Sequence, residues 1–160
     1  MRSHDGLRDS LTHLASPGLF YEELRREIAR VRRSGDLISL AKFALRSDVH
    51  GAGDPRLREF DIEVLSFSHT LSRLTRAEDM CSRIGSLEFL VLLHGSDSVA
   101  MALIERVAVA WIGDLAEHAG TDYQCRVTLE NSHLPHIAGE SALEFLNRLD
   151  QKVRTADIPL

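Results

Sequence analysis

The sequence predicts an α+β domain, in which amphipathic helices are combined with short apolar strands. Four segments carry apolar residues at helical spacing and begin with helix-start signals or follow a loop. These segments begin near Pro17, Arg56, Asp97 and Ser141. Between them lie short apolar runs, and two of these runs flank a pair of small residues, Gly85 and Ser86, as in a β-hairpin.

The first helix and strand have clear boundaries in the sequence. Ser16 is a typical N-cap and Pro17 suits the first helical position, so a helix is expected from there to about Arg33. The apolar face of this helix is formed by Phe20, Leu24, Ile28 and Val31. Residues 34–36 end the helix, and residues 37–45 are predicted to form a strand at the centre of the sheet.

The remaining elements follow in order. A loop at residues 47–55 leads to the second helix, and the predicted hairpin has its tip at Gly85 and Ser86. The third helix is expected to end near His118, and a strand at 123–129 follows. Residues 133–136 hold two histidines without a further ligand and are interpreted as a loop. Ser141 and Glu144 form a capping-box pattern at the start of the last helix.

Composition excludes several classes of protein. The 160 residues suit one domain, and the net charge of −5 argues against nucleic-acid binding. The chain has neither an apolar run long enough to span a bilayer nor a signal segment, which predicts a cytoplasmic location without membrane insertion. Cys81 and Cys125 lack metal-type spacing, and we expect buried, reduced thiols.

The hairpin sequence Arg-Ile-Gly-Ser-Leu-Glu-Phe, residues 83–89, resembles the signature Arg-x-Gly-Gly-Asp/Glu-Glu-Phe of GGDEF domains, the diguanylate cyclase family. Gly85, Glu88 and Phe89 match, whereas Ser86 and Leu87 replace the second glycine and the first acid. Further matches in register are Asp9 to Leu14, Phe20, Asp61, Arg76 to Asp79, and Arg83.

The resemblance extends from about residue 9 to residue 157. It implies a central, mostly antiparallel five-stranded sheet flanked by helices, as in nucleotidyl cyclases. Residues 1–8 are then an N-terminal lead or linker, and residues 9–160 a degenerate GGDEF-like domain. So short a lead suggests a piece of a multidomain signalling protein.

The resemblance also implies that cyclase activity is lost. Diguanylate cyclases join two GTP molecules with Mg²⁺ held by a strand aspartate and hairpin acids. Here Ala44 stands at the aspartate and Leu87 at the first hairpin acid, while Asp157 replaces a phosphate-holding lysine. Because Mg²⁺ needs hard oxygen ligands, no metal cofactor is expected. Asp61 matches a guanine-contacting acid and could keep that contact, or be a surface carboxylate near a helix start.

Arg76 and Asp79 form an Arg-x-x-Asp pattern that in diguanylate cyclases is the inhibitory site for the product, cyclic di-GMP. A guanidinium can bind the O6 and N7 edge of guanine or a phosphate, and an aspartate accepts from guanine amines. The alternative is a solvated turn with a local ion pair. Many cyclases carry a further arginine on the next helix, where Val107 falls nearest, beside Arg106.

Two functions from different classes follow from the resemblance. In the first, a non-catalytic domain binds cyclic di-GMP at Arg76 and Asp79 and signals to a neighbouring sensory or EAL-type domain or to a protein partner. In the second, the domain is a nucleotide-free scaffold for dimerisation or partner docking, and a homodimer is one such assembly. Retained GTP binding without turnover is a third, less favoured reading, because guanine and phosphate contacts are both depleted.

Overall fold

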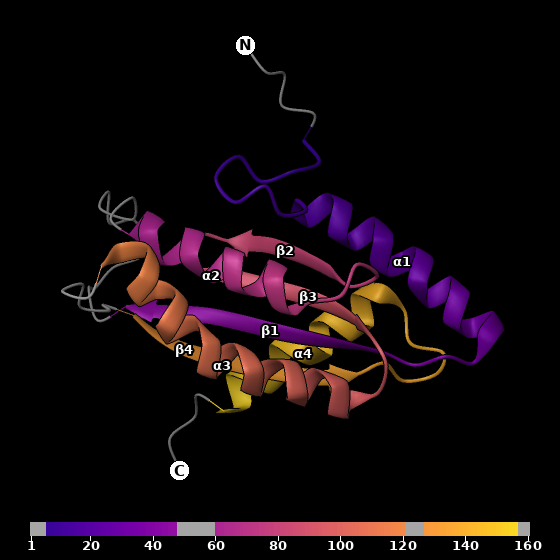
Figure 1. Cartoon of the computed structure of the whole chain (residues 1–160). Helices are drawn as coiled ribbons and strands as arrows, with labels where there is room; N and C mark the ends of the chain where they lie inside the picture. Colours follow the sequence, from indigo (N-terminus) through magenta and orange to yellow (C-terminus); the bar gives the residue numbers. More distant parts are fainter. Residues whose placement is uncertain (1–5, 48–59, 121–126, 157–160) are drawn as a thin grey trace.

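A computed structural model describes residues 6–47, 60–120 and 127–156, with the backbone alone for residues 153–156. Helices and strands follow one another along this part of the chain as drawn in Figure 1. They are α1 (Pro17–Ser34), β1 (Ile38–Ser47), α2 (Asp61–Leu74), β2 (Met80–Gly85), β3 (Glu88–His94), α3 (Asp97–Ala119), β4 (Val127–Pro135) and α4 (Ala142–Ala156). No helix in these ranges is long and apolar enough to cross a bilayer.

The described strands form one antiparallel sheet in the order β2-β3-β1-β4. Ala41 of β1 lies opposite Val91 of β3 on one side and His133 of β4 on the other, so β1 is an inner strand as predicted. The antiparallel α+β architecture is confirmed. The expectation of five strands is wrong for the ranges that the structure describes, because these hold four strands, and α4 follows β4 up to Ala156, where the described ranges end.

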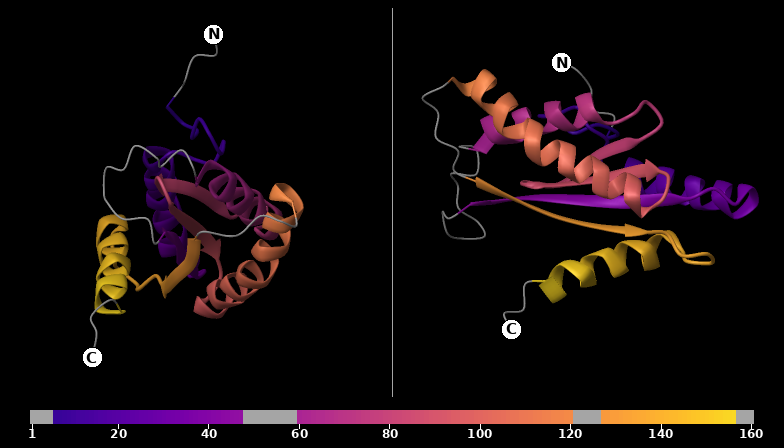
Figure 2. Two further views of the ribbon diagram at one scale, coloured as in Figure 1. Left: turned by 90° about the vertical axis from the view of Figure 1, so that its left-hand side faces the viewer. Right: turned by 60° about the horizontal axis from the view of Figure 1, so that its bottom comes forward.

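Helices cover both faces of the sheet. Side chains alternate between the faces along a strand, so β1 contributes Phe43 to a core with α2 and α3, and Leu40 to a second core with α1 and α4. Figure 2 shows α3 and α4 on opposite sides of the sheet. Phe67 of α2 lies at the centre of the first core, with its ring centroid 5.4 Å from Phe43, 4.9 Å from Phe89 and 5.5 Å from Trp111.

The ends of α1 and the start of α4 lie where short capping motifs in the sequence predict them. The Ser16 hydroxyl accepts a hydrogen bond from the Leu19 backbone N–H at 3.2 Å, which confirms the N-cap of α1. The helix ends at Gly35, whose φ of 77° is left-handed and suits glycine. At the start of α4, the backbone N–H of Ser141 donates to Glu144 and that of Glu144 donates to the Ser141 hydroxyl, as the capping box predicts. α2 begins at Asp61, and residues 56–59 lie outside the described ranges.

Two expectations about strands are wrong. The hairpin turns at Ser86 and Leu87, one residue later than predicted, because Gly85 still pairs with Glu88 across the strands. His133 lies within β4 and not in a loop, since β4 continues along β1 as far as Pro135. The predicted strand at 123–129 thus starts, in the described part, only at Val127.

Of the two cysteines, the structure describes Cys81. Cys81 is a free thiol, and its burial raises its pKa to about 11 although a hydrogen bond with Thr75 opposes that shift. A thiol with so high a pKa stays protonated near neutral pH, which agrees with the expected reduced, unreactive state. Cys125 lies outside the described residues.

Candidate functional site

Arg83 fixes the hairpin to the N-terminal segment. Its guanidinium donates to the carbonyl oxygens of Gly85 at 3.2 Å and Ser86 at 2.8 Å, and to the Asp9 carboxylate at 3.3 Å. Asp9 in turn accepts hydrogen bonds from the backbone N–H and the hydroxyl of Thr12, at 2.8 and 2.7 Å. The Asp-x-Leu-Thr and hairpin motifs, far apart in sequence, therefore meet in one hydrogen-bonded unit.

The hairpin residues that depart from the signature are accommodated by the fold. Leu87 packs against the core beneath α2 and α3, and its carbonyl oxygen accepts a hydrogen bond from the Leu45 N–H at 2.8 Å. Ser86 is exposed.

The hairpin residues that match the signature are also held by their surroundings. A Cβ atom at Gly85 would lie 3.1 Å from a carboxylate oxygen of Glu88, so this position favours glycine through close approach. Phe89 is fully buried in the aromatic cluster around Phe67.

A lysine lies beside the position where a metal-binding aspartate would stand. Ala44 pairs with Glu88 across β1 and β3, and Lys42, two residues earlier, is on the same face of the sheet. The Lys42 ammonium lies 3.4 Å from Asp150 of α4 and 4.0 Å from Glu88, with its side chain only 13 % exposed. A lysine so covered needs carboxylate partners. Lys42 therefore pairs most closely with Asp150, and its positive charge also lies near the remaining hairpin acid, Glu88.

These groups do not fit Mg²⁺. Ala44 offers no oxygen, and the ammonium of Lys42 repels a second cation near Glu88. Among the described residues there is no group of three or more histidine, cysteine, aspartate and glutamate side chains that could hold a metal ion. Asp157, which the resemblance places where the family has a phosphate-holding lysine, lies outside the described residues.

Arg76 and Asp79 form a tight turn between α2 and β2. One Asp79 carboxylate oxygen accepts from the Arg76 backbone N–H at 3.0 Å, and the other accepts from the His94 backbone N–H at 3.3 Å. The Asp79 side chain is only 5 % exposed, whereas Arg76 is exposed. Asp79 thus holds the turn in place, using two of the roughly four acceptor positions of a carboxylate. Arg76 is left to face outward.

The guanidinium of Arg76 borders an open surface groove of ≈ 440 Å³ against the N-terminal half of α3. Arg106 of α3 borders the same groove, together with Glu105 and three small or apolar residues. Within the described part of the chain, neither Arg76 nor Arg106 forms an ion pair or a side-chain hydrogen bond. Val107, at the position nearest the family's further arginine, is buried. The groove is therefore bordered by two arginines without an ion-pair partner among the described residues and by one glutamate, Glu105.

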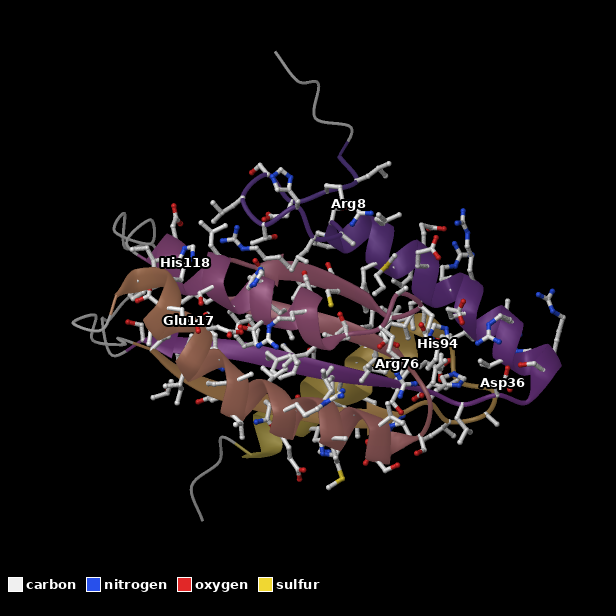
Figure 3. All side chains as sticks on the ribbon, in the orientation of Figure 1. Arg8, Asp36, Arg76, His94, Glu117 and His118 are labelled. Carbon is white, nitrogen blue, oxygen red and sulfur yellow. The ribbon has the colours of Figure 1, made fainter. Side chains whose placement is uncertain are left out.

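His94 connects this turn to α1. Its Nε2 atom lies 2.8 Å from the Glu27 carboxylate and its Nδ1 atom 3.7 Å from that of Asp79. Burial alone would raise the pKa of Glu27, but hydrogen bonds from Arg30 and His94 outweigh it and keep the pKa below its ordinary value. Figure 3 labels Arg76 and His94 close together beside the start of α3. The turn is therefore fixed by contacts to both β3 and α1.

The structure separates the other predicted site residues from the groove. Arg76 and Asp79 precede β2, whereas the hairpin residues 85–89 begin at its last residue, so the length of β2 separates the two sets. Asp61 lies at the first turn of α2, opposite the end that carries Arg76, and a helix of this length is about 20 Å long. Within the described ranges, Asp61 has no ion pair or hydrogen-bond partner.

Comparison with known proteins gives the family. The family model described as "Diguanylate cyclase, GGDEF domain" matches residues 7–157, nearly the whole chain. The chain belongs to the GGDEF domain family. No curated sequence is similar enough to this chain to count as a match.

Solved GGDEF structures share the fold. The GGDEF domain of DgcB from Caulobacter crescentus, in complex with cyclic di-GMP, is 19 % identical with a TM-score of 0.77, over 98 % of this chain and 92 % of that one. The GGDEF domain of FimX from Pseudomonas aeruginosa is 17 % identical with a TM-score of 0.73, over 94 % of this chain and 93 % of that one. SiaD of the same organism, in complex with its activator SiaC, is 24 % identical with a TM-score of 0.73, over 94 % of this chain and 57 % of SiaD.

Sequence reasoning missed two contributors to these sites. The family's further arginine would align nearest to Val107, which is buried, whereas its neighbour Arg106 borders the groove. Lys42 lies within the predicted apolar strand 37–45 and has no role in the resemblance. A charged residue within a central strand is a usable signal, because its burial requires a partner of opposite charge.

Proposed function

We propose that this GGDEF domain does not synthesise cyclic di-GMP but binds it, in the groove between the Arg76 turn and α3. The observation that carries the proposal is that Arg76 and Arg106, which have no ion-pair partner among the described residues, border one open groove, with Glu105 as its one acidic residue. Cyclic di-GMP has two phosphates and two guanine edges, and guanidinium forks suit both. Asp79 is buried and does not border the groove, so its part is to fix the turn that carries Arg76.

The surroundings of the hairpin support the absence of catalysis. Phosphoryl transfer in this family needs Mg²⁺ to neutralise developing charge, and a missing electrostatic contact of this kind costs a hundredfold or more. Here Ala44 and Leu87 provide no metal ligand, and the Lys42 ammonium lies 4.0 Å from Glu88, where its charge disfavours a second cation. The Arg76 groove lies at the other end of β2, so these losses leave it unchanged. Loss of the metal ligands near the hairpin is therefore compatible with cyclic di-GMP binding in the groove.

A scaffold role is the second candidate. The observation that favours it is an exposed apolar face on α3, where Val109 is 83 % and Ile112 is 68 % exposed. Such a surface is typical of a contact with another protein. In this reading the partner binds whether or not a nucleotide is present.

We expect Arg76→Ala to weaken cyclic di-GMP binding by about 10- to 100-fold, the effect of losing one forked contact. Isothermal titration calorimetry of the purified chain measures this directly. Arg106→Ala should weaken binding in the same direction, and Asp79→Asn should do so through the turn, because the Asp79 carboxylate accepts from the backbone N–H groups of Arg76 and His94. The matched control is Arg25→Ala, which removes an exposed arginine of α1 far along the chain from the groove. Equal affinity of Arg76→Ala and the parent would exclude the groove as the site.

A further inference from the structure

Glu105 of α3 is the one acidic residue that borders the groove beside Arg76. It is exposed, and within the described part of the chain it forms no ion pair or side-chain hydrogen bond. Asp79, the acid of the Arg-x-x-Asp pattern, is buried in the turn and does not border the groove. Among the described residues that do, the only other side-chain oxygen is that of Ser98, which lies 2.7 Å from the Ser96 hydroxyl. Glu105 is therefore the charged acceptor of the groove.

Small side chains on α3 leave room for a flat ring next to Glu105. Helical geometry places Ser98, Ala102 and Glu105 within about 60° of one another around the axis, and Ser98 about 10 Å from Glu105 along it. Arg106 lies about 40° from Ala102, on the side away from Glu105. All four residues border the groove. A planar base that lies over Ala102 therefore has a carboxylate on one side and a guanidinium on the other.

A carboxylate at this position suits guanine better than adenine. Guanine carries two donors side by side, its N1–H and its 2-amino group, whereas the corresponding edge of adenine has one amino donor beside an acceptor nitrogen. A carboxylate has acceptors only, so both of its oxygens can bind guanine. On adenine the second oxygen would face another lone pair, which costs binding energy and so provides selectivity.

We propose that Glu105 selects guanine in this groove, by accepting hydrogen bonds from the N1–H and the 2-amino group of one guanine of cyclic di-GMP. This role rests on the proposed function, namely that the groove binds this dinucleotide. Arg76 and Arg106 remain available for the O6 and N7 edge or for a phosphate. The contact that the resemblance assigns to Asp79 is then made from α3, by a side chain that borders the groove.

The negative charge of Glu105 allows the two possible roles of this residue to be told apart by the sign of one effect. Both phosphates of cyclic di-GMP are negative, so a carboxylate that only stood beside the ligand would repel it, and removal of the charge would tighten binding. A carboxylate that accepts from guanine acts in the opposite direction, because hydrogen bonds to a charged acceptor are the stronger ones. Glu105→Gln removes the charge at nearly constant size. Weaker binding in this variant therefore indicates hydrogen bonding to the base.

Calorimetric titration of the whole chain with cyclic di-GMP measures this effect. Glu105→Gln is expected to weaken binding about tenfold, within the usual range for one two-pronged contact to a base. Glu117→Gln is the matched control, because it removes the charge of another exposed glutamate of α3 that does not border the groove, and it should leave the affinity unchanged. Unchanged or tighter binding in Glu105→Gln overturns the role of Glu105 and leaves the proposed function in place. A parent chain that binds no cyclic di-GMP overturns both.

Cyclic di-AMP, which differs from cyclic di-GMP only in its bases, tests the selectivity. The parent should bind it at least about tenfold more weakly than cyclic di-GMP. In Glu105→Gln this preference should fall about tenfold or more, because an amide has one acceptor and one donor group and so matches the adenine edge. An unchanged preference for guanine in this variant overturns the role of Glu105, even where both affinities fall together.

Discussion

Phe67→Ala is expected to lower the free energy of unfolding by about 3–5 kcal/mol, the usual loss for a large aromatic side chain removed from a core. Phe67 is fully buried and joins α2 to both inner strands and to α3 through three ring contacts. Small domains have a total stability of about 5–15 kcal/mol, so this single change removes a large share. Urea unfolding followed by circular dichroism measures the difference.

Ile62→Ala is the matched control for Phe67→Ala. It shortens an apolar side chain in the same helix, but Ile62 is 41 % exposed, so the loss should stay within about 1 kcal/mol. Similar losses for the two variants would show that α2 does not pack on the sheet through Phe67. The comparison therefore tests the first core independently of any nucleotide.

Arg83→Ala is expected to cost about 2–3 kcal/mol of unfolding free energy, because the change removes charge-assisted hydrogen bonds from a partly buried site. Arg83 is only 17 % exposed and holds the hairpin turn and the Asp9 segment together. Arg83→Lys should recover little of the loss, since an ammonium cannot bind several acceptors in the fixed geometry of a guanidinium. Urea unfolding measures both variants, and full recovery in Arg83→Lys would mean that only the charge matters.

The Asp9 contact makes this part of the stability depend on pH. Burial alone would raise the pKa of Asp9, but hydrogen bonds from Thr12 and then the charge of Arg83 outweigh it and hold the pKa below 3.8. A lowered pKa in the folded state gives stability that is present above the ordinary pKa and lost as pH falls through the folded one. The stability difference between the parent and Asp9→Asn should therefore be complete well above pH 3.8 and narrow as the pH falls below 3.8. A constant difference would show that the Asp9 charge contributes nothing.

The parts of the fold predicted from sequence are those encoded locally. The N-cap at Ser16, the glycine end at Gly35 and the capping box at Ser141 each depend on a few adjacent residues, and all are found where expected. Strand ends were less predictable because they depend on the partner strand. β4 continues to Pro135 along β1, which no signal within residues 127–135 indicates.

The hairpin shows why a motif can be recognised while its geometry is not. Gly85 and Ser86 predicted the tip to within one residue, but the turn lies at Ser86 and Leu87, and Leu87 packs on a core formed with distant helices. The candidate groove has the same property. Arg76 could be found from its pattern, but Arg106 could be assigned only once α3 was placed against the turn. In both cases the geometry depends on contacts between segments that are far apart in the sequence.

The central claim is that the domain binds cyclic di-GMP and does not make it. Its most direct test is calorimetric titration of the whole chain with cyclic di-GMP, beside a titration with GTP and Mg²⁺ whose products are analysed by chromatography. We predict saturable binding of cyclic di-GMP, no binding of GTP with Mg²⁺, and no newly formed cyclic di-GMP. Formation of cyclic di-GMP from GTP, or no heat with cyclic di-GMP, would contradict the claim, and the second result would leave the domain as a scaffold.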